Sequence, residues 1–156
     1  MSALFSDCGS YRYRLTRSLN GNKGSLLFIG LNPSTADATH NDPTIRRCIG
    51  FAESWGHRRL VVVNLFAFRA THPADLKSAS HPIGPDNDRI LRDEAALAET
   101  ILLGWGVHGS HRTRDQEVLH LLSPYSLSCL GRTKAGQPRH PLYLRADTVP
   151  EPYERK

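Results

Sequence analysis

The chain has 156 residues, of which 39% are hydrophobic and 22% are charged, and its formal net charge at pH 7 is +5. This length suits a single domain over residues 1–156 with one core. No apolar run approaches the roughly 20 residues of a membrane span, and the start lacks a secretory signal. We therefore expect a cytoplasmic protein without membrane contact. The basic charge favours a nucleic acid or a nucleotide as partner.

The three cysteines indicate no disulfide framework. Cys8, Cys48 and Cys129 are odd in number, far apart and without a C-x-x-C pair, which argues against a zinc ribbon and an iron–sulfur cluster as well. We predict reduced thiols. The acidic and histidine residues at 37–42 and 108–111 have no recognised metal-ligand spacing. We therefore predict neither a metal nor a cofactor.

Patterns in the first third of the chain predict two strands and a helix. Apolar and polar residues alternate from Tyr11 to Thr16, which predicts a half-exposed strand over 11–18. Turn residues follow, and we expect this strand to lie antiparallel at the edge of the sheet, feeding a central strand over 25–30. Asp42 and Pro43 supply an N-cap and a first-turn proline for a helix over 43–55, whose apolar residues share one face.

Strands and helices are predicted to alternate along the rest of the chain. Residues 60–65 are apolar until their end, as expected of a parallel strand buried on both faces. After a long proline-containing loop over 67–86, expected to be ordered coil over the site or a lid, we predict helix 86–99, strand 100–106, helix 112–122 and strand 126–130. Four strands alternating with helices imply an α/β fold, a three-layer sandwich around a parallel sheet with right-handed crossovers.

Polar residues gather where these strands end. The strand at 25–30 stops at Gly30 and runs into a polar loop that includes Asn32. Asn64 lies near the end of the next strand, and Trp105 at the end of the third. The basic segment 131–144, which follows the last strand, should return to the same edge. Ligands of open α/β sheets bind in the crevice beyond the carboxyl ends of the strands.

Four short motifs in this order resemble the uracil-DNA glycosylase superfamily. Gly30-Leu31-Asn32-Pro33 is similar to the first motif of its mismatch-specific and thymine-specific branch, and His140-Pro141 is similar to the second motif. The segment 64–71 resembles the one that follows its second strand, and 103–106 resembles the end of its third strand, so the likeness spans about residues 25–145. The chain also resembles a bacterial family catalogued as domain of unknown function 1643, with its signature at Gly30–Asp37.

The glycosylase resemblance implies a sheet order of 2-1-3-4 for the four parallel strands and a role for each motif. Asn32 would position the water that attacks the glycosidic bond, and His140 or backbone amides near it would stabilise the departing base. An amide cannot act as a general base. Base catalysis would therefore need Asp37 or Asp42.

Substrate contacts follow from the same edge of the sheet. Asn64 can pair with the polar edge of a base through one donor and one acceptor, and Phe66 or Trp105 can stack on it. The loop residues expected around the substrate are Gly30, Leu31, Pro33 and Ser34.

Three basic residues are the candidates for phosphate contact from nucleic acid: Arg132, Lys134 and Arg139. Leu142 or Tyr143 could fill the stack that a flipped base leaves. Leu142 stands where the glycosylase motif has serine, and the chain ends soon afterwards. We therefore expect a single-stranded, free-nucleotide or other small substrate rather than lesion search in duplex DNA.

Other interpretations of the same residues stay open. Asn32 and Ser34 can satisfy local backbone groups of an ordinary loop, and Asn64 can cap the loop that follows it. His140 can be a surface histidine before a proline, and most surface charges are merely solvated. A second function is a non-catalytic module for a nucleotide or nucleic acid. In that case Ser34, Thr35 and the N-terminus of the helix after Asp42 would hold a phosphate.

Overall fold

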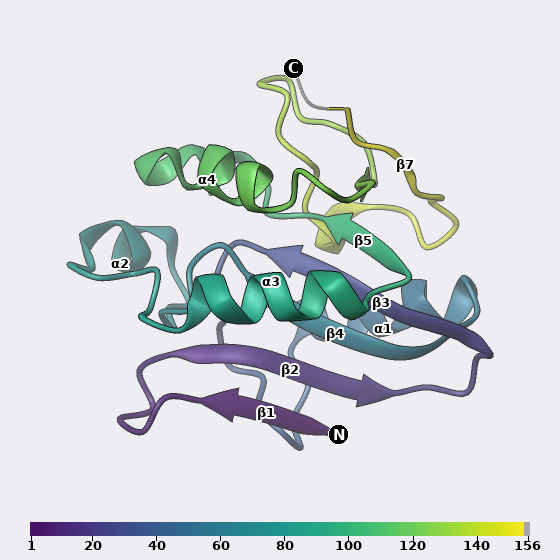
Figure 1. Ribbon diagram of the computed structural model, residues 1–156, viewed down its shortest axis with the longest axis horizontal. Coiled ribbons are helices and arrows are strands. Elements are labelled where there is room, and N and C mark those ends of the chain that lie inside the picture. Colours follow the sequence, from purple (N-terminus) through teal and green to yellow (C-terminus); the bar gives the residue numbers. More distant parts are fainter. Residues whose placement is uncertain (155–156) are drawn as a thin grey trace.

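The fold is built on one mixed sheet of seven strands. The computed structural model describes residues 1–154, which form this sheet, four α-helices and two short 3₁₀ segments (Figure 1). The strand order is β1-β2-β4-β3-β5-β6-β7. The α/β class expected from the alternating patterns is confirmed.

The centre of the sheet is parallel, and its two sides are antiparallel. The strands β3 (Lys23–Gly30), β4 (His57–Asn64), β5 (Thr100–Leu103) and β6 (Ser128–Cys129) pair in parallel. The antiparallel strands are β2 (Arg12–Ser18) and β1 (Ser2–Phe5) beyond β4, and β7 (Glu151–Pro152) beyond β6. The predicted sheet of five strands was therefore too small.

The prediction that the strand over 11–18 lies at an edge was wrong. β2 pairs with β4 on one side and with β1 on the other. β1 is only four residues long, and β7 consists of two exposed residues, one of them Pro152. Neither offers enough alternation to be seen as a strand in the sequence.

Helices cover both faces of the sheet. α1 (Pro43–Ser54) packs on one face, and α2 (Pro73–Ser78), α3 (Asn87–Leu97) and α4 (Arg114–Leu121) contribute to the core on the other face (Figure 1). Successive residues of the central strands alternate between these two cores: Leu27 and Ile29 of β3 belong to the core under α2, α3 and α4, whereas Leu26 and Phe28 belong to the core under α1. Burial on both faces explains the continuous apolar runs.

The helix over 43–55 forms almost as predicted. Asp42 accepts a hydrogen bond from the backbone N–H of Ile45 at 2.9 Å, and Pro43 occupies the first turn. Trp55 follows the last helical residue, and Gly56 has a φ of +85°. A positive φ is easily adopted only by glycine, so the residue that was expected to close the helix does so.

Two other predicted segments differ from the structure. The loop over 67–86 contains the short helix α2, which begins at Pro73 after His72. The helix expected over 112–122 starts at Arg114, because the 3₁₀ segment Val107–Thr113 precedes it and Arg112 and Thr113 both have positive φ. Two consecutive left-handed residues cannot belong to an α-helix.

No helix formed by residues 1–154 is long and apolar enough to cross a membrane. The three cysteines are free: Cys48 and Cys129 are buried in the core, and Cys8 is exposed. Their placement agrees with the expectation of reduced thiols.

Candidate functional site

A cavity of about 610 Å³ opens at the carboxyl edge of the parallel strands. Gly30 at the end of β3 pairs with Asn64 at the end of β4, and Ile29 pairs with Leu103 at the end of β5. The loops that follow these strands therefore start side by side. A volume of this size falls within the range of small-molecule sites.

Most of the predicted substrate residues meet in this cavity, although they come from loops more than 100 residues apart. The predicted residues that line it are Gly30, Leu31, Asn32, Pro33, Ser34, Asn64, Trp105 and His140. Five predicted residues are not among its lining residues: Asp37, Phe66, Arg132, Lys134 and Arg139. Arg12, Phe28 and Asp42 also line it.

The side-chain amide of Asn32 is held in one orientation. Its Nδ2 group donates to the backbone carbonyl of Ala70 at 2.7 Å and to that of Pro33 at 3.1 Å. Only the nitrogen of the amide can donate to a carbonyl, so these two bonds fix which end is the oxygen. Oδ1 remains as an acceptor, which suits a water molecule or a donor group of a ligand.

The side-chain amide nitrogen of Asn64 is buried and lacks a hydrogen-bond acceptor in the part of the chain that the structure describes. Only 4% of the residue is exposed, and Nδ2 has no hydrogen-bond acceptor within residues 1–154. A buried amide donor without an acceptor costs about 1–3 kcal/mol. Because Asn64 lines the cavity, an acceptor atom of a ligand is one way to satisfy this amide.

Phe28 also lines the cavity, and the sequence analysis missed it. A Cβ at Gly104 would lie 2.5 Å from the Phe28 ring, and a Cβ at Gly30 would lie 3.1 Å from it and 2.9 Å from Asn64 Oδ1. Glycine at the ends of β3 and β5 thus makes room for this ring beside the Asn64 amide. The sequence signal was the pair of glycines, one as the last residue of β3 and one directly after β5.

The two aromatics named from the sequence have different surroundings. Trp105 lines the cavity, is 1% exposed and donates from Nε1 to Gln137 Oε1 at 2.8 Å. Phe66 is fully buried in the core, with its ring 5.6 Å from that of His111. Trp105 and Phe28 therefore line the cavity, whereas Phe66 does not.

His140 carries a defined proton when neutral. Its Nδ1 accepts a hydrogen bond from the backbone N–H of Leu142 at 3.2 Å, so in the neutral ring the proton is on Nε2. Burial lowers the pKa of His140 below its usual 6.5, and the charge of Asp42 opposes this shift. His140 can therefore present a neutral N–H donor to the cavity at pH 7.

Of the two carboxylates named as a general base, only Asp42 lines the cavity. Its Oδ1 accepts from the Ile45 N–H at the start of α1, and its Oδ2 accepts from the Ala36 N–H at 3.4 Å. Each carboxylate oxygen has a second lone pair. Asp42 can thus accept a hydrogen bond from a further donor while it caps the helix.

Asp37 serves the loop instead. Its Oδ1 accepts from the backbone N–H groups of Thr39 and His40 and contacts His40 Nδ1 at 3.0 Å. Hydrogen bonds from Thr39 and His40 lower the pKa of Asp37 to about 2. So weak a base is poorly suited to proton abstraction at neutral pH.

We expect Asp37→Asn to lower the free energy of unfolding at pH 7. The folded pKa of about 2 lies below the ordinary 3.8, so the carboxylate stabilises the fold above pH 3.8 and loses this effect as the pH falls towards 2. Urea unfolding at pH 7, 4 and 3 measures the free energy of unfolding of variant and wild type. The difference between the two should shrink as the pH falls. Asp147→Asn is the matched control, because Asp147 forms an exposed ion pair with Arg145. An unchanged difference at all three pH values would contradict the expectation.

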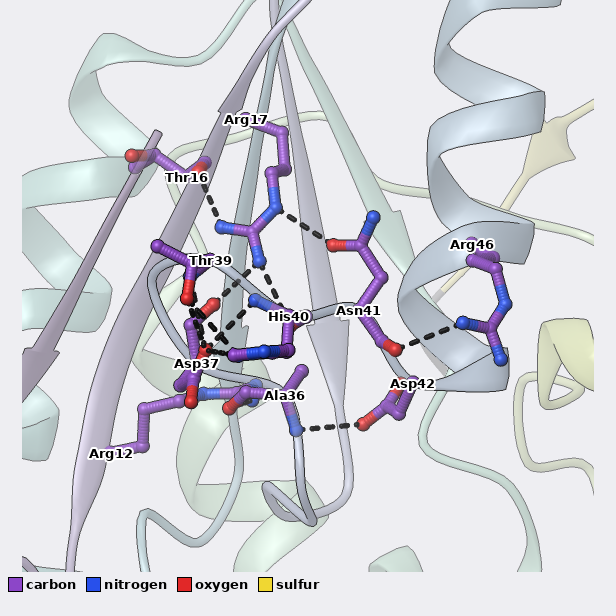
Figure 2. Close-up of polar contacts among 10 residues, drawn as sticks. All are labelled: Arg12, Thr16, Arg17, Ala36, Asp37, Thr39, His40, Asn41, Asp42 and Arg46. Atoms are coloured by element: carbon purple, nitrogen blue, oxygen red, sulfur yellow. Dashed lines mark hydrogen bonds and ion pairs between the residues drawn. The ribbon is translucent and has the colours of Figure 1, made fainter.

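Two buried arginines of β2 hold the loop that carries Asp42 (Figure 2). Arg17 donates to the backbone carbonyls of Asp37 and His40 and to Asn41 Oδ1. Arg12 Nη1 donates to the carbonyl of Ala36 at 3.0 Å. Both arginines are 2% exposed. Burial lowers the pKa of Arg12 to about 10, with Asp42 opposing the shift, so Arg12 stays charged at pH 7.

A bulge in β2 brings Arg12 to this position. Leu4 pairs with Arg14 and Phe5 pairs with Arg12, so Tyr13 is an extra residue. An extra residue reverses the alternation of side chains along a strand. Arg14 accordingly reaches Glu94 of α3 at 3.2 Å, whereas Arg12 reaches the loop before α1. The simple alternation read from the sequence could not separate these two arginines.

The three basic residues expected to contact phosphate, Arg132, Lys134 and Arg139, are not among the residues that line the cavity. Arg132 stacks over the Tyr153 ring, with Cζ 3.9 Å from its centre, and donates to the carbonyls of Gly136 and Glu154. Lys134 and Arg139 are exposed. Only Arg139 has a described side-chain bond, to the carbonyl of Arg132 at 3.2 Å. Within residues 1–154, no three His, Cys, Asp or Glu side chains form a group that could hold a metal ion.

One protein family matches the chain. The model of the family described as "Protein of unknown function (DUF1643)" covers residues 12–142, which includes every residue of the cavity discussed above. Neither a curated protein nor a solved structure matches the chain.

Proposed function

Since the chain belongs to the DUF1643 family, for which no function is known, we propose from its cavity that it hydrolyses the N-glycosidic bond of a nucleotide, free or in DNA. The observation that carries the proposal is the buried Asn64 amide without an acceptor, in the same cavity as Asn32, Asp42 and His140. A nucleobase offers the acceptor that this amide lacks. The fold proposed with it is that of the uracil-DNA glycosylase superfamily.

In this proposal the base occupies the end of the cavity near Asn64. The Asn64 amide pairs with the polar edge of the base, and Phe28 or Trp105 contacts its face. Stacking on an aromatic side chain is worth about 1–3 kcal/mol per base. The close approach of Gly30 to Asn64 and Phe28 supports this arrangement, because any larger residue would intrude on both.

In the proposed reaction, two side chains accept hydrogen bonds from the attacking water, and a third donates a hydrogen bond to the departing base. Asn32 Oδ1 and the Asp42 carboxylate orient a water molecule, Asp42 accepts its proton, and the water oxygen attacks the anomeric carbon. The base leaves with the electrons of the glycosidic bond. The neutral His140 Nε2–H donates a hydrogen bond to the developing base anion, which lowers the barrier as an oxyanion-type donor does.

The decisive experiment is a base-release assay. The substrates are normal, modified and damaged deoxynucleotides, given as monomers and within single-stranded and duplex oligonucleotides. Asn32→Ala and His140→Ala should each lower the rate of release by about 10²-fold or more, because each removes one element of transition-state stabilisation. Nucleotide affinity should change far less.

Asn20→Ala and His120→Ala are the matched controls, because both residues are exposed and outside the cavity. Full activity of the Asn32 and His140 variants would exclude the mechanism. If wild type binds nucleotides tightly but releases no base from any substrate, the protein is a non-catalytic binding module, which was the second interpretation of the sequence.

A further inference from the structure

Arg12 is a buried cation with unused hydrogen-bonding capacity. Its Nη1 donates to the Ala36 carbonyl, but its Nε–H has no acceptor anywhere in residues 1–154. Arg12 is almost wholly buried, since only 2% of it is exposed, and it lines the cavity. A guanidinium group has five N–H donors in a planar fork that matches the oxygens of a phosphate. The side chain is therefore placed to bind an oxyanion.

The N-terminus of α1 forms part of the same wall. α1 has 12 residues, and Thr44 in its first turn lines the cavity together with the hydroxyl residues Ser34 and Thr35. The start of a helix carries a partial positive charge and free N–H groups, which favour anions. These features add to the charge of Arg12.

Asp42 limits the affinity of this wall for anions. Its carboxylate lines the cavity and caps α1, so it repels a second negative group. No ion pair joins Arg12 to Asp42 within residues 1–154, whereas Arg14 and Arg114 do have carboxylate partners. The guanidinium group of Arg12 is thus not neutralised by direct contact.

We propose that Arg12, Thr44 and the Ser34–Thr35 hydroxyls, which all line this cavity, form a phosphate subsite in it. The inference rests on the proposed function, because the phosphate is that of the nucleotide whose base contacts Asn64. The group can come from a mononucleotide or from a strand of nucleic acid, since both carry the same phosphate chemistry.

The first measurement compares the affinities of several ligands for the Asp42→Asn variant. If Asp42 is the general base, this variant cannot hydrolyse the ligands during the measurement. Calorimetry would measure the dissociation constants of a deoxynucleoside, its 5′-monophosphate, inorganic phosphate, and a short single-stranded oligonucleotide with the same base. We expect the monophosphate to bind at least about tenfold more tightly than the nucleoside. A mononucleotide as tight as the oligonucleotide identifies a free nucleotide as the source. Equal affinity of nucleoside and monophosphate would overturn the proposal.

The second measurement assigns the preference to Arg12. Arg12→Gln should abolish the ratio between monophosphate and nucleoside, and Arg12→Lys should restore part of it. Arg46→Gln is the matched control: Arg46 is exposed in α1, loses the same charge and is absent from the cavity lining. A folded Arg12→Gln protein that keeps the ratio would contradict the subsite.

If Arg12→Gln does not fold, the subsite is tested by comparing the binding of inorganic phosphate to the wild-type protein and to Asp42→Asn. Removing the Asp42 charge should tighten binding of inorganic phosphate several-fold, because it removes a like charge beside the anion. An unchanged phosphate affinity places the anion elsewhere. These binding results stand even if no base is ever released, so failure of the subsite and failure of the hydrolase are distinguishable.

Discussion

Asp42→Asn should lower base release by about 10²–10⁴-fold, the usual contribution of a positioned general base. The amide that replaces the carboxylate cannot accept the proton of the attacking water. Helix α1 should survive, because asparagine is as good an N-cap as aspartate and can still accept from the Ile45 N–H. The measurements are single-turnover base release and the thermal unfolding midpoint.

Asp37→Asn is the informative comparison for this prediction. The two residues lie in the same loop and lose the same charge, but Asp37 is outside the cavity lining. Any loss of activity in the Asp37 variant should follow from its lower stability and disappear at a temperature where it is folded. A larger loss of release for Asp37→Asn than for Asp42→Asn would reverse the assignment of the base.

The sequence was sufficient to predict which strand ends meet. Parallel strands bring their carboxyl ends to one edge by geometry alone, and Asn32, Asn64 and Trp105 each follow a strong apolar run. All three line one cavity with His140. The prediction succeeded here because it depended on strand direction and not on the contacts of any side chain.

The residues that were missed depend on contacts across the fold. Arg12 reaches the cavity wall only because Tyr13 is an extra residue in β2, and a bulge has no simple sequence signal. Phe28 reads as an ordinary core residue of an apolar run, and only the glycines of two neighbouring strands reveal the space around it. Phe66 was named as a residue that can stack on a base, but it does not line the cavity. Its side chain follows a strand end, yet it points into the core.

We expect Gly104→Ala to destabilise the fold, because Gly104 leaves room for the Phe28 ring. Gly104→Ala would place a Cβ 2.5 Å from the Phe28 ring and 3.4 Å from the Arg139 carbonyl. The φ of Gly104 is not in the left-handed region, so alanine meets no backbone strain and the cost is one of packing. Overpacking of this kind costs about 1–3 kcal/mol. The unfolding midpoint should fall by about 2–4 °C for each kcal/mol.

Gly50→Ala is the matched control for this substitution. Gly50 lies inside α1, and a Cβ added there would meet no atom within 4 Å, so alanine should raise stability by up to about 1 kcal/mol. The same chemical change is thus expected to have opposite signs at two glycines. Equal effects at both positions would mean that the Phe28 ring is not confined.

A second substitution separates packing from any other effect of Gly104→Ala. Phe28→Leu shortens the crowded side chain, so the double variant should be more stable than the sum of the two single losses predicts, as interacting neighbours require. Nucleotide affinity should fall in Gly104→Ala if the displaced ring enters the cavity, and it should partly return in the double variant. Strict additivity of the two stability losses would show that Phe28 and Gly104 are not coupled, and Gly104 would then not be the residue that makes room for the ring.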